Sequence, residues 1–235
     1  MCVYTFREGG FVHFSPTKLM QFVPEHLHLW RFSCLLVCLS SVSTLVFILA
    51  MREVLEEKFR FIVGVAVCLA VVACAQDLEA ITRMMVLFAD ISLQGVIACT
   101  YLTQDLVQLG WLLINQSITQ TFMVASFLYG LAGLFIVRCL LSTRVLPRSL
   151  AYAHLPVWAT MVASSITTFL GYLPISVVLI FAGNLGLSVL SAFSGVAIDA
   201  VLEVNKKKDE EPKGEEPEQA QPRGDEPEPR GNSGI

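Results

Sequence analysis

Charged residues are scarce over the long stretch from Leu29 to Leu202, and the sequence offers few other polar segments there. Only 15% of the 235 residues are charged while 54% are hydrophobic, which gives a mean hydropathy of +0.64. Soluble domains carry about 25% charged residues. A stretch this long and this poor in charge is too apolar for a soluble core. It therefore predicts an integral membrane protein whose first partner is the lipid bilayer.

Other absences narrow the function classes. The sequence contains no basic patch interleaved with aromatic residues, so we expect no nucleic-acid partner. It contains no HExxH, no GxSxG, no phosphate-binding glycine loop and no pair of carboxylates inside a span. The seven cysteines form no CxxC and have no zinc-like spacing with histidine. The sequence thus predicts no cofactor, no metal site and no catalytic residues.

The apolar stretch divides into pieces of about 20 residues, the length needed to cross a bilayer. Because the bilayer core holds no water, each piece must be helical to satisfy its backbone groups. We predict an all-α, polytopic transmembrane helix bundle over residues 29–204. Its six expected spans are Leu29–Ala50, Phe61–Ala75 continuing through Gln76–Arg83, Met84–Leu102, Thr119–Leu141, Leu150–Gly171 and Leu173–Leu202.

The distribution of lysine and arginine favours six spans. With the N-terminus inside, six spans place 10 basic residues on the cytoplasmic side and 3 on the other. If Met84–Leu102 is instead re-entrant, five spans with the N-terminus outside place 9 inside and 4 outside. Both arrangements leave the C-terminus in the cytoplasm.

The two ends of the chain differ in character from the apolar stretch. In the leader, residues 1–28, Ser15-Pro16 is typical of a helix start and predicts a short helix at the membrane interface. The tail, residues 205–235, has a proline every five residues from Pro212 to Pro227 and many glutamates. Such a segment cannot bury enough surface to fold, so we expect a disordered cytoplasmic tail. It either tethers a protein partner or only solvates the chain.

Asp90 is the most conspicuous polar residue in a predicted span. A carboxylate in a membrane costs about 2.5–3.5 kcal/mol on insertion scales and is usually functional or paired. Gln94 lies one turn further along the same face, and Asn184 is a polar residue of the last span. These three residues form a candidate intramembrane site for a proton or cation. The alternatives are an ion pair with Arg83, a position near the interface, and helix packing through Asn184.

Small residues recur at four-residue spacing and predict close helix packing or a homo-oligomer. They fall on the second and sixth predicted spans. The residues expected at helix contacts are Ala66, Ala70, Gly183, Gly186, Ser191 and Gly195.

The segment Ser142–Leu150, reading STRVLPRSL, resembles a cytoplasmic loop of an uncharacterised family of bacterial six-span membrane proteins, a domain-of-unknown-function family. In that loop a small residue is followed by arginine, two apolar residues, proline and arginine, which correspond here to Arg144, Pro147 and Arg148. The likeness covers the C-terminal half. The first half departs from the family, because Met51–Arg60 is a short link where the family has a long external segment. The resemblance implies a bacterial inner-membrane location and no activity.

Three classes of function follow from these features. The first is a non-enzymatic membrane protein with a structural, regulatory or interaction role. The second is a small permease or ion-coupled carrier that uses Asp90. The third, a membrane-embedded enzyme, has no motif in its favour. A polar cavity reaching Asp90 and Asn184 would favour the second or third over the first.

Overall fold

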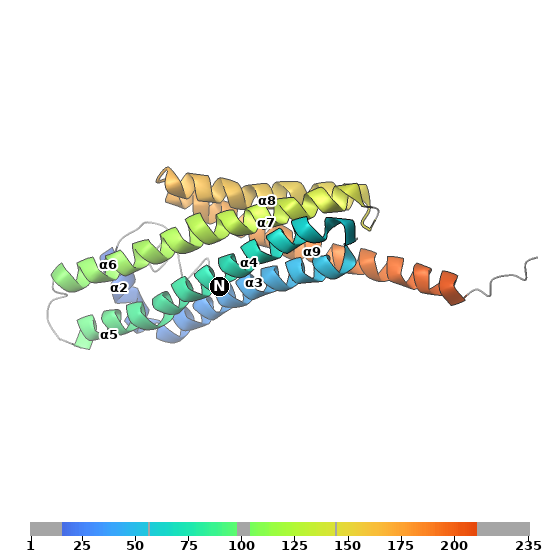
Figure 1. Cartoon of the computed structure of the whole chain (residues 1–235). Helices are drawn as coiled ribbons and strands as arrows, with labels where there is room; N and C mark the ends of the chain where they lie inside the picture. The colour runs from blue at the N-terminus through green and yellow to red at the C-terminus, as the bar shows by residue number, and fades with distance from the viewer. Residues whose placement is uncertain (1–15, 56, 98–103, 144, 211–235) are drawn as a thin grey trace, which may run out of the picture.

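The computed structural model describes residues 16–55, 57–97, 104–143 and 145–210, and these residues form helices and no strand. The long helices run roughly along one direction in an elongated bundle, and α2 crosses them (Figure 1). Their bounds are α2 (Pro16–Glu25), α3 (Leu27–Val54), η1 (Glu57–Phe59), α4 (Arg60–Arg83), η2 (Met84–Phe88), α5 (Ala89–Ile97), α6 (Gln104–Ile118), η3 (Thr119–Ala125), α7 (Ser126–Ser142), α8 (Arg148–Phe169) and α9 (Leu173–Glu210).

Two of the long rods are built from several elements without a break. The π-helical turn η2 joins α4 to α5, and the π-helical turn η3 joins α6 to α7. The predicted second and third spans, 61–83 and 84–102, therefore share one rod as far as Ile97, and residues 98–102 lie outside the described part of the chain. The prediction of two separate spans here is wrong. No proline interrupts the rod, and π-helical turns absorb an extra residue without ending a helix.

A polar cluster explains how this rod continues through Gln76–Arg83, where the sequence suggested an end of the apolar span. Arg83 is ion-paired with Glu79 on the same helix face. Gln120, from η3, donates to Gln76 Oε1 over 2.7 Å and to Glu79 Oε2 over 2.9 Å. The polar side chains that looked like a break in the sequence thus satisfy one another across two helices.

The all-helical class is confirmed, and the count of six spans is not. Four helices of the described chain are long and apolar enough to cross a membrane: Leu27–Val54, Glu57–Gln94, Val107–Ser142 and Leu173–Ala200. The fifth long helix, α8, has 22 residues, or about 33 Å of rise, but is not among the four. It packs between α7 and α9.

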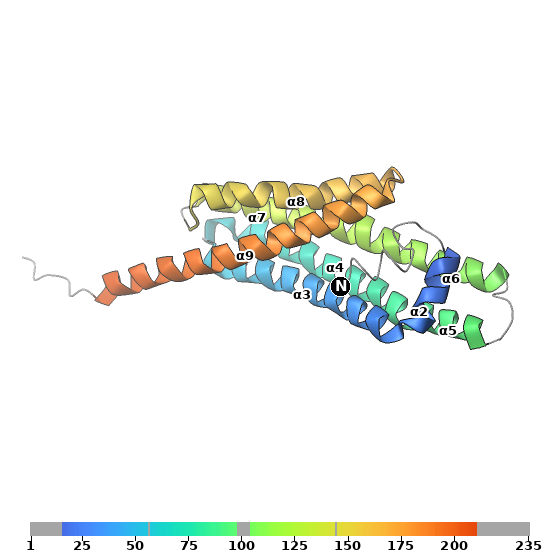
Figure 2. The same ribbon diagram turned by 180° about the vertical axis from the view of Figure 1, so that it is seen from behind.

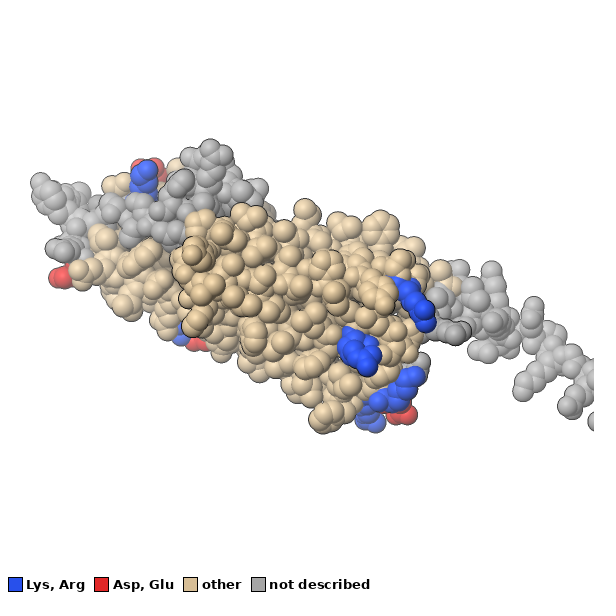
Figure 3. Space-filling view, turned by 90° about the horizontal axis from the view of Figure 1, so that it is seen from above, with Lys and Arg blue, Asp and Glu red and all other residues tan. Residues whose placement is uncertain are grey.

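The exterior of the described bundle is apolar, unlike that of a soluble protein, and its interior includes small polar side chains. Small polar side chains are buried, including Ser33, Ser41, Ser164 and Ser194. Large apolar side chains point outward, and the outer face of α3 carries Phe32, Leu35, Leu39, Val42, Val46 and Leu49. The middle of the face seen in Figure 3 shows no charged side chain, and lysine and arginine gather near the end from which α9 projects. An apolar exterior of this kind matches a lipid environment.

The predicted packing residues lie in different surroundings. Ala66 and Ala70 are fully buried within the apolar core of the bundle. A methyl group added at Gly183 would lie 2.9 Å from Thr160 Oγ1, and one at Gly186 would lie 2.8 Å from Val157, so both glycines face α8 closely. Ser191 lines a cavity beside α3, and Gly195 has open space around it.

Both ends of the fold refine the sequence expectation. Helix α2 begins at Pro16, where the Ser15-Pro16 signal placed a helix, and it packs across α5 and α6 (Figure 1). Helix α9 continues to Glu210 and extends beyond the other helices (Figure 2). Residues 205–210, which the sequence assigned to the tail, are therefore helical. Residues 211–235 lie outside the described chain, as do residues 1–15 of the leader.

Candidate functional site

The buried carboxylate of this bundle is Asp77, on α4. Only 6% of its surface is exposed, and it is the one acidic residue among the buried residues described. Helix α4 places it there because Ala66, Ala70 and Ala73 occupy the same inward face, and Asp77 follows Ala70 by seven residues, or two turns. The small side chains bring neighbouring helices close, and Asp77 faces them.

Hydrogen bonds hold only one side of this carboxyl group. Ser41, on α3, donates from Oγ to Asp77 Oδ2 over 2.7 Å. The Tyr129 hydroxyl, on α7, donates to the Ser41 backbone carbonyl over 3.1 Å. Asp77 Oδ1 is buried without a hydrogen-bond partner, and so is the hydroxyl of Thr121 on η3. One oxygen is thus fixed by α3, and the Thr121 hydroxyl interacts more weakly with the same carboxyl group.

The register of α3 sets the depth of Asp77 along the apolar length of the bundle. Between Arg31 and Arg52, α3 has 20 uncharged residues, which span about 30 Å and match the hydrocarbon thickness. Ser41 is the tenth of these residues. Since Ser41 is bonded to Asp77, the carboxyl lies close to the middle of this apolar segment.

Asp77 has no countercharge among the described residues. The ion pairs of the described chain are Arg60 with Glu57 and Arg83 with Glu79, and neither includes Asp77. An ionised carboxylate without a partner is very costly in an apolar interior. The site is therefore stable only when a proton or a cation neutralises it.

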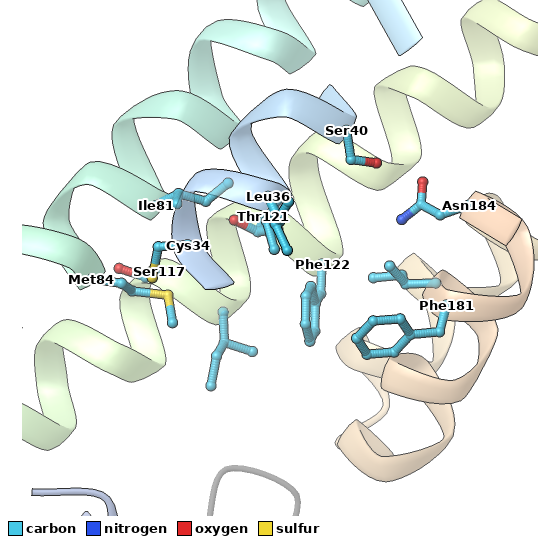
Figure 4. Close-up of a pocket in the computed structure, with 13 residues that line it drawn as sticks. Cys34, Leu36, Ser40, Ile81, Met84, Ser117, Thr121, Phe122, Phe181 and Asn184 are labelled. Carbon is cyan, nitrogen blue, oxygen red and sulfur yellow. The ribbon is translucent and has the colours of Figure 1, made fainter. Parts of the chain in front are cut away.

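Two connected cavities lie beside the carboxyl. The inner one, of about 50 Å³, is lined by Asp77, Ser41, Thr121 and Tyr129 among others. The outer one, of about 170 Å³, is mainly apolar. The two share six lining residues, namely Val37, Ser40, Thr121, Phe122, Ile180 and Asn184. In Figure 4 the polar ends of Ser40 and Asn184 face each other across the gap between α3 and α9.

The residues proposed from the sequence as an intramembrane site are not brought together. Asp90 and Gln94 are exposed on α5. Trp30 donates to the carbonyl of Met84, and Asp90 lies six residues further along the rod, or about 9 Å beyond that level. Asp90 thus sits toward the Arg31 end of α3, the interface alternative raised from the sequence. Asn184 does line both cavities, and it shares the inner one with Asp77 rather than with Asp90 or Gln94.

The loop motif lies at one end of the bundle, away from the cavities. Arg144 is outside the described residues, and Pro147 and Arg148 are exposed. The Pro147 carbonyl accepts hydrogen bonds from the backbone of Leu150 and Ala151, so this proline starts α8. The motif shapes the turn between α7 and α8.

Sequence reasoning passed over Asp77 because it lies in a polar run with Gln76, Glu79 and Arg83. The sequence nevertheless contained a signal. Ala66 and Ala70 mark one face of the helix, and Asp77, seven residues after Ala70, lies on the same face. The described residues contain no group of three or more His, Cys, Asp or Glu side chains placed to hold a metal ion. The site instead offers carboxyl, hydroxyl and amide oxygens.

Comparison with known proteins does not assign this site. No family model matches the chain, and no curated protein and no solved structure matches it. The functional argument therefore rests on the geometry around Asp77.

Proposed function

We propose that this protein is a small multi-pass carrier of a bacterial inner membrane in which Asp77 alternately holds a proton and a cationic solute. The observation that carries the proposal is the half-bonded carboxyl of Asp77, buried near the middle of the apolar segment beside two connected cavities. Intramembrane ionisable residues of this kind commonly mark substrate or ion pathways. This favours the carrier class over a purely structural role, and Asp77 takes the place that the sequence suggested for Asp90.

The exchange keeps the site neutral in both states. When the cavity is empty, the carboxyl group carries a proton. When a cation binds, the proton leaves the carboxyl oxygen and the carboxylate pairs with the cation. A charge-neutral site is the condition for burial in an apolar bundle. Ser41 can hydrogen-bond to either form, because a hydroxyl both donates and accepts.

Proton–cation exchange in vesicles tests this function. The full chain is reconstituted in vesicles that are acidic inside and contain a pH-sensitive dye, and Na⁺, K⁺ or benzyltrimethylammonium is added outside. We expect at least one of these cations to discharge the gradient in the wild-type protein. Asp77→Asn should abolish the discharge because an amide cannot release a proton to exchange.

Asp90→Asn is the matched control and should leave the discharge unchanged. No discharge by any cation in the wild type, or equal discharge in Asp77→Asn, would overturn the carrier proposal. Loss in Asp90→Asn with Asp77→Asn intact would restore the site expected from the sequence.

We also propose that all five long helices cross the membrane, with the N-terminus outside and the C-terminus in the cytoplasm. Among the described residues, the end of the bundle bearing the α3–α4 and α7–α8 turns, together with the extension of α9, carries 8 basic residues; the opposite end carries 3. The 8 are Arg52, Lys58, Arg60, Arg138, Arg148, Lys206, Lys207 and Lys208. Positive residues favour the cytoplasmic side.

Single-cysteine labelling checks this topology. In a cysteine-free background, Lys58→Cys should react with an impermeant thiol reagent only after the membrane is opened. Tyr172→Cys, at the turn between α8 and α9, should react from outside in intact cells. Both side chains are exposed, so accessibility does not limit either reaction. The reverse pattern would contradict five spans in this orientation.

A further inference from the structure

We propose that the cationic solute is an amphipathic organic cation, with one apolar body about the size of an aromatic ring and one ammonium group, and that it enters sideways from the bilayer between α3 and α9. The inference rests on the proposed function and names its substrate class. The body would occupy the outer cavity and the ammonium would pair with Asp77.

The outer cavity has the chemistry of an apolar pocket with one polar end. Its wall includes Ile81, Met84 and Ile118, and the rings of Phe122 and Phe181 lie close together at one side (Figure 4). Aromatic faces attract ammonium groups and also pack against apolar bodies. A bare inorganic cation would gain little from such walls.

The size of the outer cavity sets the size of the ligand. Its volume of about 170 Å³ compares with the roughly 150 Å³ of an apolar cavity known to accept benzene. One ring or a short branched alkyl group therefore fits. A larger fused-ring body would require the helices to separate.

The polar end leads to the negative charge. Ser40 and Asn184 stand where the outer cavity meets the inner one, and the inner cavity of about 50 Å³ ends at Asp77. Asp77 Oδ1 is buried and has no hydrogen-bond partner. A single positive charge at this end would neutralise the carboxylate, which no basic side chain of the described chain does.

The seam between α3 and α9 is the weakly packed side of the site. Helix α9 packs along α8 but touches α3 at few points. A third cavity, of about 400 Å³, continues along this seam and again includes Ser40 and Asn184. The outer faces of both helices are apolar, while the wall of the cavity also carries the hydroxyl groups of Ser43, Thr44, Ser188 and Ser191. The seam therefore offers polar groups to an ammonium beneath an apolar exterior. A membrane-dissolved amphipathic cation reaches Asp77 by this route without crossing the bundle.

Binding to the purified full chain tests the inference. Equilibrium dialysis in detergent would measure benzyltrimethylammonium, with neopentylbenzene as the neutral molecule of the same shape. We expect the cation to bind the wild type about tenfold or more tightly than the neutral molecule, and to bind Asp77→Asn about tenfold or more weakly than the wild type. Val37→Phe should abolish binding, because Val37 lines both cavities. Val42→Phe, on the lipid-facing side of α3, should bind normally.

The outcomes separate this inference from the carrier function. Discharge of the proton gradient by Na⁺ or K⁺ without binding of benzyltrimethylammonium would overturn the inference and leave the carrier intact. Equal binding of neopentylbenzene, or unchanged binding in Asp77→Asn, would show a cavity for any apolar molecule, such as a lipid chain, and would also overturn it. If Val37→Phe does not fold, Phe181→Leu replaces it. This variant keeps an apolar wall but removes the ring. Unchanged binding would contradict the proposed position of the apolar body in the outer cavity.

Discussion

Replacing Gly133 by alanine is expected to lower the free energy of unfolding by about 3 kcal/mol or more, a large effect for one added methyl group. Gly133 lies on α7 directly beneath Trp158 of α8. A methyl group there would lie 1.8 Å from Trp158 Cδ2 and 2.3 Å from two further ring atoms. These distances are far inside van der Waals contact, so the ring or one of the helices must move.

The Trp158 ring has no free space into which it could move. Trp158 is fully buried, and Phe47 of α3 lies on another side of it, with ring centroids 6.4 Å apart. Alanine is otherwise favoured over glycine inside a helix by about 1 kcal/mol, so the clash must exceed that gain before any destabilisation is seen. We expect it to do so because close-packed interiors do not yield locally.

Unfolding in mixed micelles of a mild detergent and dodecyl sulfate, followed by circular dichroism, measures this effect. Gly64→Ala on α4 is the control, because a methyl group there meets nothing within 4 Å and should be neutral or slightly stabilising. The double variant Gly133→Ala, Trp158→Leu should recover part of the loss. A Gly133→Ala protein as stable as Gly64→Ala would contradict the close α7–α8 packing.

The sequence was sufficient for the helical membrane class, and it failed where partners on different helices decide the outcome. The run Gln76–Arg83 contains four polar side chains that suggest an exit from the membrane when α4 is considered alone. In the bundle, Gln120 satisfies Gln76 and Glu79, and Arg83 is paired with Glu79. No local pattern on α4 could show this, because Gln120 is 44 residues from Gln76.

The candidate site is a second case in which contacts between helices, rather than the local sequence, decide the outcome. Asp90 stood out because its sequence neighbours are apolar, yet Phe88 and Ala89 pack inside the bundle while Asp90 itself is exposed. Asp77 looked ordinary among polar neighbours, yet it is the residue turned inward. What decides between them is the helix face, and the small residues Ala66, Ala70 and Ala73 mark that face. The position of a residue around the helix axis, rather than the number of apolar residues near it in the sequence, therefore indicates which carboxylate is buried.

Trp30→Phe is expected to be more destabilising than Trp158→Phe by about 1–3 kcal/mol, although both tryptophans are fully buried. The two substitutions remove the same atoms and differ in one hydrogen bond. Trp30 Nε1, on α3, donates to the Met84 carbonyl over 3.0 Å. Trp158 Nε1 is buried without a partner.

The Met84 carbonyl matters because it opens the π-helical turn η2. In a π-helical turn the hydrogen-bond pattern shifts from the i+4 to the i+5 residue, and carbonyls near the shift need donors from elsewhere. Inside a membrane no water can replace a lost donor. Trp30→Phe therefore removes a hydrogen bond to a buried carbonyl, whereas Trp158→Phe removes a donor that had no acceptor.

The same unfolding assay applied to both variants isolates this bond, because the loss of volume is common to them. We expect Trp30→Phe also to weaken benzyltrimethylammonium binding, since Met84 and Ile81 line the outer cavity and Trp30 fixes the turn that carries Met84. Equal stability of the two variants would mean that η2 holds its shape without α3. The packing along the seam beside Asp77 would then depend on α9 alone. The hydrogen bond of Trp30 would not fix the α3 side of the proposed entry route.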